Sequence, residues 1–141
     1  MRAVRQRGDG PTVVLLDGWP DSFLRFDKVL PLLTVLDVVV PCLPGHPWAL
    51  PTEPPAMSTS DMADLVADAL AELRIERYVV SGGDIGSSVA EHLAASHRRR
   101  VRLHLTDVPY SHLFAVDAGE LSQPERDYLD AGRTWQMAEG A

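Results

Sequence analysis

The sequence predicts an α/β fold, with a mainly parallel sheet flanked by helices. Short apolar runs rich in β-branched residues alternate with segments of helical periodicity along the 141-residue chain. This alternation is typical of parallel sheets with helices on their faces. A glycine-rich turn also joins the third apolar run directly to a helix. Loops that follow parallel strands gather at one sheet edge, where such folds place their sites.

Four apolar runs are predicted to be strands. Each is five residues or shorter and contains valine, isoleucine or leucine side chains, as buried parallel strands do. The predicted strands are residues 12–16, 37–41, 78–81 and 101–105.

Helices are predicted between and after these strands. Residues 23–33 follow Ser22, a residue suited to an N-cap, and place apolar side chains on one face. Residues 58–73 show the clearest periodicity, and Ser58 with Asp61 resembles a capping box. Further helices are expected at residues 87–96 and, with a proline in the first turn, 124–137.

The turn after the third strand carries the strongest chemical signal. Gly82 and Gly86 flank Asp84 two residues away on each side. This small-x-nucleophile-x-small spacing is typical of a nucleophile elbow, a sharp turn that lifts one side chain above the sheet. The turn also points the following backbone N–H, that of Ile85, at the same place. An aspartate at the apex can attack carbon and form an ester with its substrate.

Two other interpretations of this turn stay open from the residues alone. A phosphate-binding loop is disfavoured, because the glycines do not fit G-x-G-x-x-G and a carboxylate would repel phosphate. A plain turn in which Asp84 caps the following helix competes more strongly.

Composition narrows the classes of partner and the compartment. The net charge of −7 disfavours nucleic acids and acidic membranes as partners. The apolar runs are too short to span a membrane, and no apolar core follows the arginines after Met1, so no signal peptide is expected. The single cysteine, Cys42, permits no internal disulfide and predicts a cytoplasmic location. No metal-ligand spacing is present.

Four blocks of the chain resemble epoxide hydrolases of the α/β-hydrolase superfamily. Residues 17–23, D-G-W-P-D-S-F, resemble the family's H-G-W-P-x-S-F stretch, and residues 41–45, P-C-L-P-G, its P-x-x-P-G loop. Residues 77–87 resemble the nucleophile block that usually reads G-G-D-W-G-S, and residues 103–105 the L-H-L that follows. The order and spacing of the blocks agree with the family.

The resemblance implies a mechanism without metal or cofactor. Asp84 would open an epoxide through an alkyl-enzyme ester, and a histidine-activated water would release a vicinal diol. The backbone N–H groups of Trp19 and Ile85 would form the oxyanion hole. The peptide joining Trp19 to Pro20 resembles one that is cis in the family. The substrate would be a small apolar epoxide.

The chain departs from the family pattern in three ways. Asp17 stands where the family has histidine, and Ile85 replaces the usual tryptophan, which counts against a haloalkane dehalogenase. The family's catalytic histidine has no counterpart, so residues 1–110 are interpreted as the N-terminal part of a hydrolase core and 111–141 as the start of a helical cap. His46 and His112 are the loop histidines at the expected site edge.

Truncation makes full turnover by this chain alone doubtful and keeps alternatives open. One is a non-catalytic remnant or a module that binds apolar ligands or partners; an esterase or dehalogenase is less favoured. A sheet without its remaining strands would also leave an unpaired edge, which predicts self-association.

Overall fold

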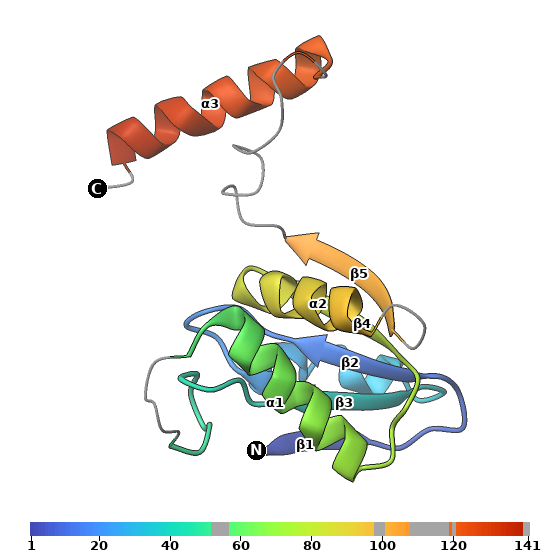
Figure 1. Cartoon of the computed structure of the whole chain (residues 1–141). Helices are drawn as coiled ribbons and strands as arrows, with labels where there is room; N and C mark the ends of the chain where they lie inside the picture. The colour runs from blue at the N-terminus through green and yellow to red at the C-terminus, as the bar shows by residue number, and fades with distance from the viewer. Residues whose placement is uncertain (52–56, 98–100, 108–118, 120, 140–141) are drawn as a thin grey trace. The chain divides into compact units, whose positions relative to one another are not determined.

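The computed structural model describes residues 1–51, 57–97, 101–107, 119 and 121–139 (Figure 1). The chain divides into two compact units, Met1–Val108 and Pro109–Ala141. The first unit contains the sheet, and the described part of the second contains helix α3 (Gln123–Glu139). The assignment of these parts to a hydrolase core and a cap stays a prediction. Within the described ranges, no helix is both long enough and apolar enough to cross a membrane.

The first unit is built on a five-stranded, mainly parallel sheet, which confirms the predicted fold class. The spatial order of the strands is β1-β3-β2-β4-β5. Only β1 runs antiparallel to its neighbour. The strands are β1 (Ala3–Gln6), β2 (Thr12–Leu16), β3 (Asp37–Pro41), β4 (Tyr78–Gly83) and β5 (Val101–Asp107).

Strand β1 was not predicted from the sequence. It is a four-residue edge strand that pairs with β3 along its whole length. Its segment is largely polar, and only Val4 packs against a core cluster. A single inward apolar residue gives too little alternation to separate a short edge strand from a loop.

Helices α1 (Thr59–Glu72) and α2 (Ile85–Ser96) cover one face of the sheet (Figure 1). Their apolar sides meet the strand residues that point toward that face, such as Val14, Leu16 and Val80. The predicted capping box at the start of α1 is confirmed, because Ser58 Oγ accepts from the Asp61 N–H at 3.2 Å while Asp61 Oδ2 accepts from the Ser58 N–H at 3.2 Å.

The opposite face is covered by two short 3₁₀ segments, η1 (Phe23–Phe26) and η2 (Leu30–Leu32). The prediction of one continuous helix over residues 23–33 is therefore wrong. Pro31 lies inside η2 and has no N–H to bond a carbonyl four residues earlier. The apolar side chains of this segment are nevertheless directed to the core. Phe23, Phe26, Leu30 and Leu33 pack on Leu15, Val38 and Val40.

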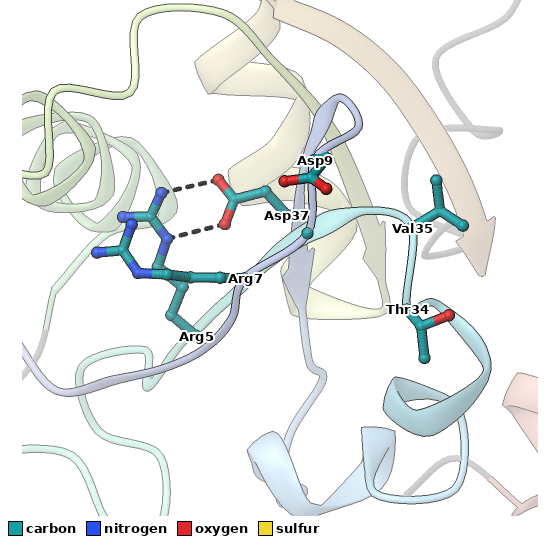
Figure 2. A pocket seen from close by; sticks show the side chains of 7 residues that line it. Arg5, Arg7, Asp9, Thr34, Val35 and Asp37 are labelled. Carbon is teal, nitrogen blue, oxygen red and sulfur yellow. Dashed lines mark hydrogen bonds and ion pairs between the residues drawn. The ribbon is translucent and has the colours of Figure 1, made fainter.

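A partly buried ion pair lies at the opposite end of the sheet from the glycine-rich turn. Figure 2 shows the Arg5 guanidinium facing the Asp37 carboxylate, with Nε–Oδ1 and Nη2–Oδ2 distances of 2.9 and 2.8 Å. Thr12 Oγ1 donates to the same Oδ2 at 3.0 Å. The pair lines a cavity of about 530 Å³, and Arg7 lines the same cavity. Hydrogen bonding to Arg5 lowers the pKa of Asp37 against the opposing effect of burial.

This lowered pKa predicts a loss of stability in acid. Because the Asp37 pKa is lower in the folded chain, its contribution is complete above the unfolded-state pKa of about 4 and disappears as the pH falls through the folded value. Urea unfolding at pH 7, 5, 4 and 3 would measure it. The difference in unfolding free energy between the chain and Asp37→Asn should be largest at pH 7 and shrink below about pH 4. An equal difference at pH 7 and pH 3 would contradict this.

Candidate active site

The chain makes a sharp, strained turn where β4 passes into α2. Asp84 lies at the apex with φ 53° and ψ −127°, a backbone conformation that non-glycine residues rarely adopt and that concentrates at functional sites. A Cβ on Gly82 would lie 2.2 Å from the Gly86 carbonyl oxygen. A Cβ on Gly86 would lie 2.6 Å from the Asp17 carbonyl oxygen. Both glycines are therefore required by the close approach of backbone segments.

The Asp84 carboxylate is held against the loop that follows β2. Its Oδ2 accepts a hydrogen bond from the Trp19 backbone N–H at 2.9 Å. Gly18 makes this approach possible, because a Cβ there would lie 2.6 Å from Asp84 Cβ and 2.7 Å from Oδ2. The Asp84 side chain is half-buried. It therefore presents one oxygen to a backbone donor and leaves Oδ1 without a hydrogen bond to any described residue.

The alternative in which the Asp84 side chain caps α2 is wrong. Asp84 occupies the N-cap position, but its side chain makes no capping hydrogen bond. The first turn is instead closed through the Asp84 carbonyl oxygen, which accepts from Ser87 N–H at 2.9 Å and from Ser87 Oγ at 2.6 Å. The carboxylate therefore does not serve as a helix cap.

Ile85 is the first residue of α2, and its partly buried side chain packs on the main core. Among the described residues its backbone N–H has no hydrogen-bond acceptor, as expected for the first turn of a helix. Its role as an oxyanion donor stays a prediction. The side chain that replaces the family's tryptophan contributes to the core rather than to an exposed wall.

The loop that carries Trp19 has the expected cis peptide bond to Pro20. Trp19 is 57% exposed. Its indole meets the His46 ring edge-on, with ring centroids 5.7 Å apart and an interplanar angle of 75°. The structure therefore brings the P-C-L-P-G-H loop beside the D-G-W-P loop.

Behind Trp19 lies a buried pair of polar side chains. Asp17 Oδ2 and His46 Nδ1 are 3.0 Å apart, and the two side chains are 1% and 2% exposed. The remaining atoms, Asp17 Oδ1 and His46 Nε2, are also buried and have no hydrogen-bond partner among the described residues. Asp17, which stands where the family has histidine, thus has a specific partner of its own.

Three of the other histidines lie within the described residues. His92 and His97 are exposed on and after α2. His104 lies on β5, where its Nδ1 is 2.9 Å from Ser81 Oγ. His112 lies outside the described residues. No described histidine hydrogen-bonds Asp84, and no three His, Cys, Asp or Glu residues of the described ranges gather in a way that could hold a metal ion.

The Asp17–His46 pair was not predicted, although both residues were considered separately. They are 29 positions apart, and no spacing rule links an aspartate in one loop to a histidine in another. The signal available was topological. The two loops leave the carboxyl ends of β2 and β3, which are adjacent parallel strands.

Comparison with known proteins supports the architecture of the fold. A family model described as alpha/beta hydrolase fold matches residues 11–124. The juvenile hormone epoxide hydrolase of Manduca sexta is 30% identical over 107 residues, which are 70% of this chain and 23% of that protein. Epoxide hydrolase 1 of Oryctolagus cuniculus is 24% identical over 71% of this chain and 25% of its own length.

A solved structure gives the same picture. The epoxide hydrolase of Aspergillus niger superposes with a TM-score of 0.72 and 27% identity, covering 98% of this chain and 39% of that chain. The chain spans about a quarter of the length of the Manduca sexta and Oryctolagus cuniculus relatives.

Proposed function

Because this chain belongs to the alpha/beta hydrolase fold family, we propose that it carries the nucleophile and oxyanion elements of an epoxide hydrolase site. The observation that carries the proposal is the 2.9 Å hydrogen bond from the Trp19 N–H to Asp84 Oδ2. It joins the two loops whose sequences resemble epoxide hydrolases. The relatives named epoxide hydrolases support the reaction class.

The two oxygens of Asp84 have different roles in this proposal. Oδ1 attacks an epoxide carbon, the carbon–oxygen bond of the ring breaks, and the ring oxygen takes a proton from solvent or an acid. The product is an ester in which Oδ2 is the carbonyl oxygen. When water attacks that carbonyl, negative charge develops on Oδ2, where the Trp19 N–H already points and the Ile85 N–H is available.

No described histidine hydrogen-bonds Asp84, so none of them is assigned as the base for the second step. Asp84 can still be alkylated, because that step needs no base. The resulting ester is expected to persist or to hydrolyse slowly. Small apolar epoxides are the proposed substrates. The exposed indole of Trp19, next to the N–H that binds Asp84, offers an apolar wall.

Intact-protein mass spectrometry tests the proposal. Incubation with styrene oxide should add one epoxide mass, and fragmentation should place it on Asp84, since Oδ1 is the unpaired oxygen. Asp84→Asn should reduce the adduct at least about 100-fold, because an amide oxygen is a poor nucleophile. Asp21→Asn is the matched control, because Asp21 lies in the same loop region as Trp19 but its side chain bonds only Ser22 and Arg25 among the described residues. Asp21→Asn should form the epoxide adduct to the same extent as the chain without substitutions.

An adduct spread over several carboxylates, or one that persists in Asp84→Asn, would refute the nucleophile role. Diol formation over many cycles would instead show that a base is supplied. His46→Phe and His112→Phe would then identify which histidine supplies it.

We also propose that the free edge of β5 supports self-association. Within the described residues β5 pairs only with β4, and Leu103 on it is 43% exposed. An unpaired strand edge is a template for another chain. Sedimentation velocity between about 5 and 200 μM should show concentration-dependent dimers or larger species, which Leu103→Lys should reduce. A monomer throughout that range would contradict this proposal.

A further inference from the structure

The buried Asp17–His46 pair lies where it can control the donor that binds Asp84. Asp17 is separated from Trp19 only by Gly18, and the His46 ring contacts the Trp19 indole. The same two side chains bond each other at 3.0 Å. Asp17 is therefore the first residue of the segment Asp17–Trp19, and His46 contacts its last residue, whose N–H binds Asp84.

This segment needs to be held from outside. Gly18 has no side chain and cannot be given one, because a Cβ would meet Asp84. A glycine leaves the backbone with more freedom than any other residue. The direction of the next N–H, that of Trp19, would consequently vary unless the neighbouring residues were fixed.

The backbone of His46 is hydrogen-bonded within its own loop. The His46 N–H donates to the Leu43 carbonyl at 3.1 Å, and its own carbonyl accepts from Ala49 N–H at 3.1 Å. On the other side, the Asp17 carbonyl packs against Gly86 in the first turn of α2. The pair thus connects the loop after β3, the loop after β2 and the elbow.

Stability alone does not explain such a pair. Burying two polar or charged side chains costs free energy that their mutual bond often only offsets. Here two of the atoms, Asp17 Oδ1 and His46 Nε2, lack any partner in the described part of the chain. Apolar residues of similar size would pack without that cost.

We propose that Asp17 and His46 are positioning residues that fix the Trp19 N–H toward Asp84 Oδ2. The inference rests on the proposed function for its catalytic meaning, but the positioning itself can be measured without any reaction. In this arrangement His46 acts through the Nδ1 bond to Asp17, and its Nε2 takes no part in chemistry.

The decisive variant replaces both partners, Asp17→Leu with His46→Phe. It removes the polar pair without leaving a buried charge unpaired, so the chain should fold, and it keeps an aromatic ring beside Trp19. His46→Asn is the conservative variant, because its amide can take the place of Nδ1 and has nothing in the place of Nε2. The readouts are the Trp19 amide resonance, its hydrogen-exchange protection and the rate of Asp84 alkylation.

Positioning predicts that the double variant loses at least about 10-fold in Trp19 amide protection and about 10- to 100-fold in alkylation rate. His46→Asn should stay within about threefold of the unmodified chain in both. Asp37→Asn is the matched control, since it breaks a partly buried ion pair at the far end of the sheet and should leave the Trp19 amide unchanged.

The outcomes separate this inference from the proposed function. A double variant that folds with an unchanged Trp19 amide overturns the inference, whatever happens to alkylation. A shifted amide in a chain that is never alkylated supports positioning and counts against the proposed function. If His46→Asn is alkylated normally but accumulates ester that the unmodified chain hydrolyses, His46 is a base through Nε2 and the inference is overturned.

Discussion

Gly82→Ala is expected to destabilise the first unit by about 3 kcal/mol or more. The added Cβ would lie 2.2 Å from the Gly86 carbonyl oxygen and 2.5 Å from its carbon. Both are backbone atoms of α2, so no side chain can rotate away to make room. Domains of this size are stable by about 5–15 kcal/mol, so this one methyl group removes a large share of the total. Urea unfolding followed by circular dichroism would measure the loss.

Gly45→Ala is the matched control for this prediction. Gly45 has φ +80°, but no atom lies within 4 Å of the position where its Cβ would be built. Only the cost of a left-handed backbone remains, which is about 1 kcal/mol. If both variants lose the same stability, backbone overlap at the elbow is not what demands glycine at position 82.

Gly18→Ala is expected to abolish the alkylation of Asp84, with a loss of at least about 100-fold. Its Cβ would lie 2.6 Å from Asp84 Cβ and 2.7 Å from Oδ2. The Cβ of Asp84 is fixed by the strained elbow, so the carboxylate cannot give way by a rotation at its far end. Asp84 and the Trp19 N–H should separate. The rate of styrene oxide incorporation, measured by mass spectrometry, reports the effect.

Gly10→Ala separates this effect from a general loss of stability. Gly10 precedes β2 at the opposite end of the sheet, and a Cβ there would lie 2.6 Å from the Val35 carbonyl oxygen. The clash is comparable and remote from Asp84. Gly10→Ala should lose stability and retain its alkylation rate per folded molecule. If Gly18→Ala is alkylated as fast as Gly10→Ala, the proposed geometry of the carboxylate is wrong.

Elements with a strong local pattern were predictable from the sequence, and weakly patterned ones were not. The buried strands β2 and β3 begin and end at the predicted residues, because their continuous β-branched runs have few other stable states. The helix expected over residues 23–33 failed because its apolar spacing suits a helix while Pro31 does not allow one to continue. Strand β1 exists only because β3 offers it an edge.

The sequence by itself determined the turn at Asp84 and the alternation that gives a parallel sheet. Both depend on neighbouring residues: the glycines flanking Asp84 permit the close backbone approach, and the periodicity assigns strands and helices. Only the tertiary structure decided what surrounds the carboxylate. The Trp19–Asp84 and Asp17–His46 bonds join residues 65 and 29 positions apart. Such contacts arise because adjacent parallel strands deliver their following loops to one edge, where pairing depends on distance in space rather than along the chain.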